Sequence, residues 1–295
     1  MKILLIYFTG TYNTRYLSGL LASRFRERAD TVDLVEINCN TPICSCIGYD
    51  LIGFSYPIYG FNAPRPFEQY VAKLKFTPGQ KFFIYKNSGE TLSMNNASSR
   101  LLLRSMRRNG CTFSGEYHYV MPYNIHFPFD HAFVRQILHM NEKLMDIMLY
   151  DLDHGIVKQC KSNPIYDIGA FFVGIQKIGG DINSFLYHVD RDKCINCGLC
   201  VKNCPCNNIY VKDGKIKFHH HCDMCMRCSF HCPTNAINIG FLQGWRVNGA
   251  YPFEKIKKDT TPLQPYITQD SEGFYKCFIT YFEQIEQEHA RLFGK

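Results

Sequence analysis

A cysteine run that occurs twice constrains this chain more than any other feature of its sequence. Both copies have the pattern Cys-x2-Cys-x2-Cys-x3-Cys-Pro; the first begins at Cys194 and the second, 28 residues later, at Cys222. These two runs hold eight of the 15 cysteines in the 295-residue chain. A secreted disulfide scaffold is usually short and spreads its cysteines along its whole length. The observed distribution therefore excludes that class of protein.

The spacing within each run is typical of thiolates that surround iron–sulfur clusters. In tandem runs of this kind, three cysteines of one run hold a 4Fe-4S cluster together with the fourth cysteine of the other run. The sequence therefore predicts two clusters with crossed ligand sets: Cys194, Cys197, Cys200 and Cys232 for cluster 1, and Cys222, Cys225, Cys228 and Cys204 for cluster 2. Structural zinc is the alternative, although zinc ribbons use two separated Cys-x2-Cys pairs and need no such run. We predict ordinary packing for the other seven cysteines.

The first half of the chain alternates short apolar runs with longer amphipathic ones. The predicted strands cover residues 2–8, 31–37, 50–56, 81–86 and 117–121. The predicted helices cover residues 13–29, 64–74, 96–109 and 131–154. Strands that alternate with helices indicate a doubly wound parallel α/β sheet, because parallel neighbours need crossover connections. Ligands of such sheets bind beyond the carboxyl ends of the strands. A binding site is therefore expected among the loops at residues 9–14, 56–63, 87–95 and 121–130.

The loop after the first strand, Thr9-Gly10-Thr11-Tyr12-Asn13-Thr14, has the composition of an anion site. Hydroxyls and backbone N–H groups at a helix N-terminus favour negative charge. The glycine spacing matches neither the dinucleotide fingerprint nor the Walker loop, so dinucleotides and ATP are poor candidates. A Thr-rich loop of this form is typical of a site for a single phosphate monoester.

Together with the cysteine runs, this loop resembles the phosphate loop of flavodoxins, which binds flavin mononucleotide (FMN). The chain as a whole is similar to the flavodoxin-ferredoxin fusion family of anaerobes. Residues 57–60 (Pro-Ile-Tyr-Gly) and 121–124 (Met-Pro-Tyr-Asn) also carry the resemblance. It implies a flavodoxin-like domain with a five-stranded sheet over residues 1–185 and a small α+β ferredoxin-like 2[4Fe-4S] domain over residues 186–240. Residues 241–295 are predicted to form an extension whose last helix docks onto another domain through Phe278, Phe282 and their apolar neighbours.

The resemblance also implies where FMN binds. Its phosphate is expected at Thr9, Thr11, Asn13 and Thr14, and its ring between Pro57, Tyr59 and Gly60 and the loop of Asn87, Ser88 and Gly89. Tyr12 departs from the family pattern, which usually has glycine at that position.

Two residues of the loop after the fifth strand are candidate catalytic groups. In a flavin reductase a Tyr or a His can supply the proton that accompanies reduction of the substrate. Tyr123 and His126 are therefore predicted proton donors. The alternative is that both side chains fill space at the end of the strand.

These features predict a cytoplasmic iron–sulfur flavoprotein oxidoreductase. It would pass single electrons between a low-potential donor or acceptor protein such as a ferredoxin, the two clusters and FMN, and reduce a small-molecule acceptor at the flavin. One alternative is an electron carrier with no small-molecule substrate of its own, which would dock an acidic partner through Arg100, Arg104, Arg107 and Arg108, unless this face is simply solvated. Another is a redox sensor built on the spare cysteines.

Neither nucleic acid nor a membrane is an expected partner. The formal charge of +7 falls to about +1 once two clusters and a flavin phosphate are counted. No nucleic-acid recognition motif is present, and no stretch approaches the ~18 apolar residues that a membrane span needs.

Overall fold

The centre of the molecule is a five-stranded parallel sheet in the order β2-β1-β3-β4-β5, seen in a computed structural model that describes residues 1–173 and 176–294. The strands are β1 (Lys2–Phe8), β2 (Thr31–Ile37), β3 (Leu51–Ser55), β4 (Lys81–Ser88) and β5 (Thr112–Val120). Every pair of neighbours in this sheet is parallel. This strand order is that of the flavodoxin-like doubly wound fold, so the predicted fold class is confirmed.

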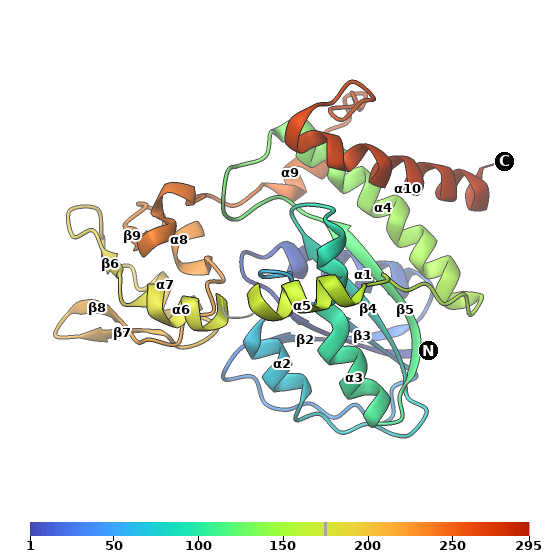
Figure 1. Ribbon diagram of the computed structural model, residues 1–295, viewed down its shortest axis with the longest axis horizontal. Coiled ribbons are helices and arrows are strands. Elements are labelled where there is room, and N and C mark those ends of the chain that lie inside the picture. The colour runs from blue at the N-terminus through green and yellow to red at the C-terminus, as the bar shows by residue number, and fades with distance from the viewer. Residues whose placement is uncertain (174–175, 295) are drawn as a thin grey trace.

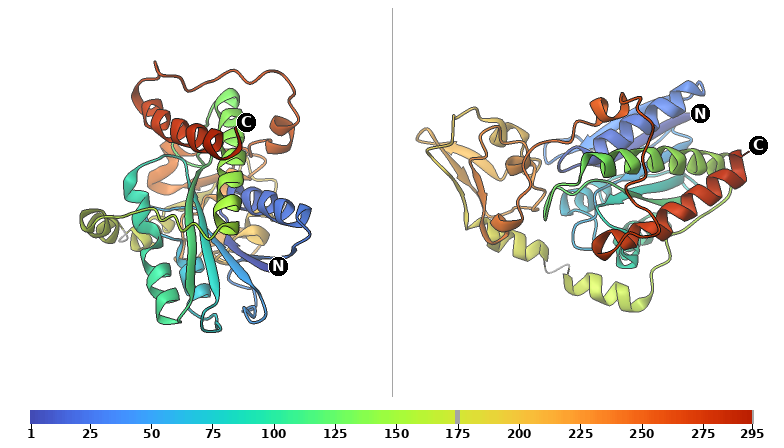
Figure 2. Two further views of the ribbon diagram at one scale, coloured as in Figure 1. Left: turned by 90° about the vertical axis from the view of Figure 1, so that its right-hand side faces the viewer. Right: turned by 90° about the horizontal axis from the view of Figure 1, so that it is seen from above.

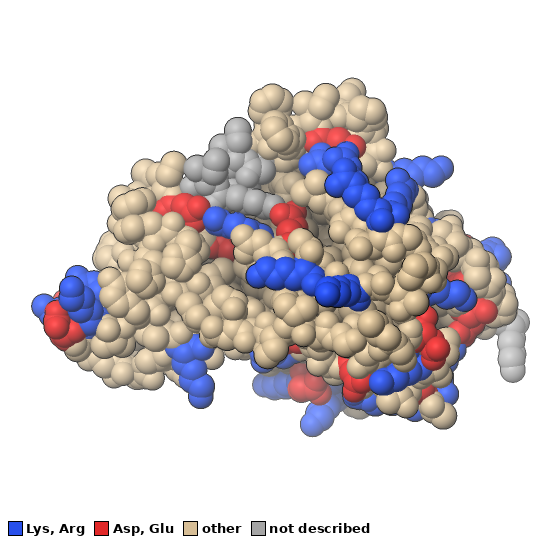
Figure 3. All heavy atoms as spheres, turned by 90° about the horizontal axis from the view of Figure 1, so that it is seen from below, with Lys and Arg blue, Asp and Glu red and all other residues tan. Residues whose placement is uncertain are grey.

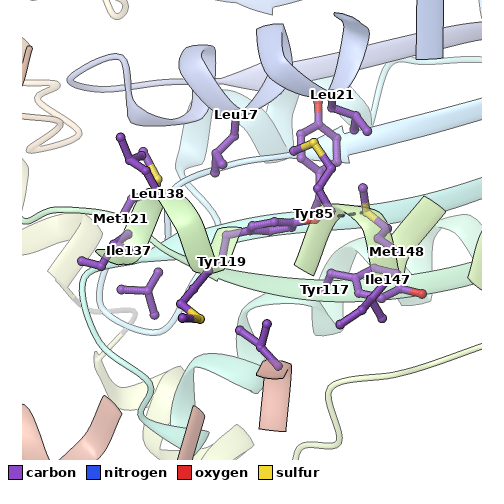
Figure 4. Packing of buried hydrophobic residues seen from close by; sticks show 14 of the residues in the cluster. Leu17, Leu21, Tyr85, Tyr117, Tyr119, Met121, Ile137, Leu138, Ile147 and Met148 are labelled. Carbon is purple, nitrogen blue, oxygen red and sulfur yellow. Dashed lines mark hydrogen bonds between the residues drawn. The ribbon is translucent and has the colours of Figure 1, made fainter. Parts of the chain in front are cut away.

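Helices cover both faces of the sheet (Figure 1). One face carries α1 (Asn13–Glu27) and α4 (His131–Asp153), and the other carries α2 (Arg65–Val71) and α3 (Arg100–Arg108). Successive side chains of a strand point to opposite faces, so Ile3 and Leu5 pack toward α1 while Leu4 and Ile6 pack toward α2. Figure 4 shows the first core, in which Tyr85 and Tyr119 of the sheet lie among side chains of α1 and α4.

Several predicted boundaries differ from the structure. The single helix predicted over residues 96–109 is instead a 3-10 segment, η1 (Ser93–Ser99), followed by α3. Ser98 donates a hydrogen bond to the carbonyl of Asn95, and such local bonds compete with an α-helix. β5 begins at Thr112 rather than at residue 117, and β4 continues to Ser88, because its pairing with β5 extends to these residues.

A small α+β domain lies at the carboxyl ends of the central strands (Figure 1). It contains an antiparallel pair, β6 (Tyr187–Val189) with β9 (Ile237–Ile239), and a hairpin of β7 (Ile209–Lys212) and β8 (Lys215–Phe218). Two short helices, α7 (Leu199–Asn203) and α8 (Arg227–Phe230), carry cysteines of the two runs. The domain has an apolar core of its own, formed by strand residues and the cysteines.

Two helices between the domains, α5 (Pro164–Val173) and α6 (Gln176–Ser184), were not predicted from the sequence. In α5 the apolar side chains of Ile165, Ile168 and Phe172 are exposed to solvent. In an ordinary amphipathic helix such side chains form the buried face. After β9 the chain forms η2 (Gly240–Trp245), α9 (Phe253–Lys257) and η3 (Gly273–Lys276).

The last helix, α10 (Cys277–Phe293), packs along α4 (Figure 2). Phe278, Phe282 and Ile285 are buried in the same core as Phe133 of α4. The docking helix predicted for the tail is therefore present, and the flavodoxin-like domain receives it. Within the described ranges, no helix is both long enough and apolar enough to cross a membrane.

A buried ion pair joins β4 to β5 beside the candidate site. The Lys86 ammonium lies 2.7 Å from a Glu116 carboxylate oxygen, and neither side chain is exposed to solvent. Lys86 also donates to the Asn95 carbonyl at 3.1 Å, and the Cys160 N–H donates to the other Glu116 oxygen at 3.2 Å. The pair therefore anchors the segment that follows β4.

Removing one partner of this pair should destabilise the protein strongly. We expect Lys86→Ala to lower the free energy of unfolding by about 3–5 kcal/mol, because the Glu116 charge is left buried without its partner. The double variant Lys86→Met with Glu116→Gln removes both charges and should recover most of the loss. Guanidinium denaturation followed by near-ultraviolet circular dichroism measures both effects. Equal stability of Lys86→Ala and the unchanged protein would contradict this interpretation.

Candidate functional site

A cavity of about 430 Å³ opens at the carboxyl ends of the central strands. All four of the loops predicted to surround a ligand contribute to its wall, through Asn13, residues 57–63, residues 87–90 and residues 121–126. The small domain supplies the remaining side, which includes Cys222, Asp223, Met224 and Met226. The cavity therefore lies between the two domains.

The phosphate loop enters α1 with several hydrogen-bonding groups unused. The hydroxyl of Thr9 is buried without a hydrogen-bond partner among the described residues. The Asn13 side-chain amide donates to the Pro122 carbonyl at 2.8 Å, and its unpaired oxygen is an acceptor, so that oxygen adds no donor for a phosphate. Thr11 accepts from the Asn124 amide at 3.2 Å and Thr14 from the Asn87 amide at 2.9 Å, so each hydroxyl hydrogen is free to donate. The first N–H groups of a helix also lack intrahelical partners. This donor set fits a phosphate monoester.

Tyr12, which departs from the family pattern, adopts the backbone conformation that favours glycine. Its φ is 75°, in the left-handed region. A non-glycine residue there costs of order 1–3 kcal/mol. Two contacts of the ring offset this cost: the His231 ring lies 4.4 Å away between centroids, and the Arg15 guanidinium lies 4.0 Å from the Tyr12 centroid. His231 belongs to the small domain, so that domain supports the unusual residue.

Arg227 connects the second cysteine run to the phosphate loop. Its side chain is only 5% exposed. It donates to the Gly10 carbonyl at 2.8 Å and also to the Thr9 carbonyl. In a trans peptide the N–H points opposite to the C=O, so these bonds direct the N–H groups of Gly10 and Thr11 away from Arg227.

Gly10 itself is required by the close approach of the two domains. A Cβ atom on Gly10 would lie 2.2 Å from the Tyr59 hydroxyl and 2.5 Å from the Cys225 carbonyl oxygen. No side chain fits at these distances. The backbone of the second cysteine run therefore contacts the phosphate loop directly.

The loops expected to hold the flavin ring are tied to each other. The Ile58 N–H donates to the Asn87 carbonyl at 2.7 Å, and the Asn87 N–H donates to the Tyr56 carbonyl at 3.1 Å. The Tyr59 hydroxyl is buried without a partner among the described residues. Gly89 packs against the Tyr123 ring, because a Cβ there would lie 2.0 Å from a ring carbon. Pro57, Gly60 and Ser88 also line the cavity.

Both candidate proton donors line the cavity, and each has a partner that the sequence did not predict. The Tyr123 hydroxyl donates to a Glu90 carboxylate oxygen at 2.9 Å, and burial together with the Glu90 charge raises the pKa of Tyr123 well above its usual value. His126 has a φ of 83°, and its N–H donates to the Trp245 carbonyl at 2.8 Å. Glu90 belongs to the loop at residues 87–95 that was expected at the site. Trp245 reaches the site only through contacts between distant parts of the sequence, which leave no local signal.

The structure brings the cysteines of each predicted cluster set together. Cys194, Cys197, Cys200 and Cys232 line one small hollow, and Cys204, Cys222, Cys225 and Cys228 line a second. Cys206, which we had assigned to ordinary packing, also lines the second hollow. Of the other spare cysteines, Cys39 is exposed and Cys46 is buried. Among the residues in the described ranges, no three His, Cys, Asp or Glu side chains are grouped as ligands of a single metal ion.

The two hollows are built by one repeated backbone conformation. The Asn208 N–H donates to the Cys204 sulfur at 3.2 Å, and 28 residues later the Ala236 N–H donates to the Cys232 sulfur at 3.2 Å. The left-handed residues repeat at the same interval, in the pairs Asn196 and Met224, Gly198 and Met226, and Asn207 and Asn235. The duplicated sequence therefore folds into duplicated geometry.

The second hollow faces the cavity and the first faces outward. Cys222 lines both the second hollow and the cavity. Beside the first hollow, Cys197 is exposed and Ile195 is 64% exposed. The set predicted for cluster 1 is thus the outer one.

The basic face predicted on α3 is present, because Leu102, Leu103 and Met106 are buried while Arg104, Arg107 and Arg108 are exposed. These three arginines and Arg100, the fourth residue of the predicted face, line a separate surface groove. Basic side chains on this side of the molecule are visible in Figure 3.

Comparison with known proteins agrees with this division of the chain. The family model of the 4Fe-4S binding domain matches residues 187–210. A ferredoxin of Methanocaldococcus jannaschii is 45% identical over an alignment of 56 residues, and the match covers 17% of this chain and 73% of the ferredoxin. The PorD subunit of pyruvate synthase from Methanothermobacter marburgensis is 33% identical over 60 residues, which are 20% of this chain and 72% of the subunit.

Solved flavodoxin structures match the other part of the chain at low identity. Oxidised flavodoxin 1 from Bacillus cereus is 16% identical with a TM-score of 0.38, covering 52% of this chain and 99% of that one. A flavodoxin from the domain Archaea is 14% identical with a TM-score of 0.37, covering 52% of this chain and all of that one (100%). The order of the central strands, β2-β1-β3-β4-β5, gives this other part the flavodoxin-like fold. Through its cysteine-rich module the chain belongs to the 4Fe-4S ferredoxins.

Proposed function

We propose that this protein is an iron–sulfur flavoprotein oxidoreductase that reduces a small-molecule acceptor. The observation that carries the proposal is the shared cavity, which the flavin loops and Cys222 of the second cysteine set line together. A ferredoxin module that served only as an independent carrier would have no need to form a wall of this cavity.

The proposed electron path begins at the outer cluster. A low-potential donor protein such as a ferredoxin would reduce cluster 1, beside the exposed Cys197, and electrons would continue through cluster 2 to FMN. When bound, the clusters exchange single electrons and FMN combines them for two-electron chemistry. The Thr9–Thr14 loop binds the phosphate, Arg227 holds that loop against the second cysteine run, and Tyr123 and His126 face the acceptor as proton donors.

Metal analysis with a matched pair of cysteine variants tests the cluster assignment. Anaerobically purified protein should contain about eight irons and one FMN per chain. Cys204→Ser should lose about half of the iron because cluster 2 loses a ligand, whereas Cys206→Ser should keep all of it. Zinc in place of iron, or iron loss from the Cys206 variant alone, would refute the assigned ligand sets.

Arg227 should matter for the phosphate of FMN in particular. Arg227→Ala removes a buried charged donor from two carbonyls of the phosphate loop, so we expect the Kd for FMN to rise roughly tenfold or more. The Kd for riboflavin, which lacks the phosphate, should change much less. Flavin fluorescence titration measures both constants.

Arg191→Ala is the matched control for this variant, because Arg191 donates to the Ile216 carbonyl within the small domain. It should leave both flavin constants unchanged. Equal weakening of FMN and riboflavin by Arg227→Ala would show that the loop is not held in a phosphate-binding form by this residue.

The proton donors can be tested apart from cofactor binding. Tyr123→Phe and His126→Gln should retain FMN, and the residue that protonates the acceptor should slow acceptor reduction by roughly 10²-fold or more when it is replaced. Stopped-flow mixing of reduced protein with small quinone or nitro acceptors gives the rate. If the unchanged protein reduces all of these no faster than free FMN does, the carrier function is favoured instead.

A further inference from the structure

Trp245 is the single tryptophan of the chain, and its side chain is 54% exposed at the mouth of the cavity. It ends η2, directly after the small domain. Burial of a tryptophan is strongly favourable, since its side chain carries a large apolar surface. An exposed tryptophan at the edge of a cavity therefore needs an explanation other than packing.

Both domains hold Trp245 in place. Its carbonyl accepts from the His126 N–H at 2.8 Å, and the next residue, Arg246, forms an isolated antiparallel bridge with Ile125. Arg246 also donates to the carbonyls of Asn235 at 3.0 Å and Ile237 at 2.9 Å in the small domain. These bonds fix the Trp245 backbone. The indole ring packs beside the His126 ring, with 5.5 Å between the ring centroids, and stays accessible to solvent.

Other exposed apolar side chains stand around the same mouth. Leu92 is 50% exposed and Val173 is 36% exposed, and both line the cavity, as does Leu242. Isolated exposed apolar residues are common, but several around one cavity indicate a site for an apolar ligand. Polar side chains also line the cavity, among them the His126 ring and the Tyr123 hydroxyl, which is bonded to Glu90.

Away from the phosphate loop, the charged side chains of the cavity wall disfavour an anion. Glu90 and Asp223 line the cavity, and the lining residues within the described part of the chain include neither Lys nor Arg. Arg65 lies 3.7 Å from Asp223 and balances its charge, so Glu90 is the main source of negative charge. The phosphate of FMN would add further negative charge nearby. A negatively charged acceptor would therefore be repelled, whereas a neutral one would not.

We infer that Trp245 is the binding platform for a neutral, planar, largely apolar acceptor, which lies at the mouth of the cavity between the indole ring and the flavin loops. His126, held against Trp245, is placed to hydrogen-bond a polar atom of that acceptor. This inference rests on the proposed function and names the substrate class of the same site. It assigns the segment after the small domain a direct part in substrate binding.

Equilibrium dialysis of the oxidised holoprotein tests the inference with a ligand pair that differs in charge. The probes are 2-naphthamide and 2-naphthoate, which have the same planar ring and no reactivity toward thiols. We expect one 2-naphthamide to bind per chain, and 2-naphthoate to bind at least about tenfold more weakly because of its charge. Absence of saturable 2-naphthamide binding would overturn the inference.

Three variants locate the binding on the indole ring. Trp245→Ala should weaken 2-naphthamide binding by about tenfold, whereas Trp245→Phe, which keeps an aromatic face, should stay within about threefold. Phe241→Ala is the matched control, because Phe241 lies on the same segment and is 79% exposed but does not line the cavity. Unchanged binding by Trp245→Ala, or equal weakening by Phe241→Ala, would overturn the assignment.

Iron and FMN contents of the same preparations separate this inference from the proposed function. Full contents without 2-naphthamide binding contradict the acceptor site alone, and absent iron or FMN contradicts the proposed function. Loss of FMN from Trp245→Ala, with FMN retained by the unchanged protein, would mean that Trp245 holds the cofactor and would overturn the platform.

Discussion

The buried guanidinium of Arg227 is the contact on which the arrangement of the two domains depends. Arg227 lies inside the second cysteine run, between Cys225 and Cys228, yet it donates to the carbonyls of Thr9 and Gly10 in the other domain. Because a buried charge must be paired or hydrogen-bonded, this side chain cannot leave the loop without a large cost. Together with the close contact between Gly10 and the Cys225 carbonyl, this side chain holds the phosphate loop against the cysteine run.

The groups around Arg227 explain how Tyr12 can stand where flavodoxin-like sequences usually have glycine. Tyr12 takes a left-handed conformation where glycine is usual, and the rings and guanidinium groups of His231, Arg15 and Arg227 surround it. Glu36 accepts from Arg15 at 2.6 Å and lies 3.5 Å from Arg227, so it balances part of this positive charge. The phosphate loop therefore packs against the small domain, and Tyr12 forms part of that contact through His231 and Arg227.

How much the sequence could predict follows from how local each signal is. The cysteine runs and the apolar strands carry short-range patterns, so the fold class followed from them, and the structure brings the predicted cysteine sets together. Polar residues such as Ser98 and Ser99 broke the helix that periodicity favoured over residues 96–109. Trp245 enters the site through contacts with residues far away in the sequence, which no spacing rule detects. Glu90 lies in a loop that was expected at the site, and Cys206 lies close to the predicted ligand Cys204, but the pattern did not single out either residue. The helices α5 and α6 were missed. In α5 the apolar residues Ile165, Ile168 and Phe172 are exposed, so they do not form the single buried face that periodicity detects.

The proposed function requires that electrons pass from the clusters to the flavin within one chain, across the interface that Arg227 holds. An anaerobic stopped-flow measurement of flavin bleaching, started by rapid reduction of the clusters, tests this most directly. We expect a first-order rate that does not change with protein concentration, because donor and acceptor share one molecule. A rate that rises in proportion to protein concentration would mean that electrons pass between molecules, and would contradict the account.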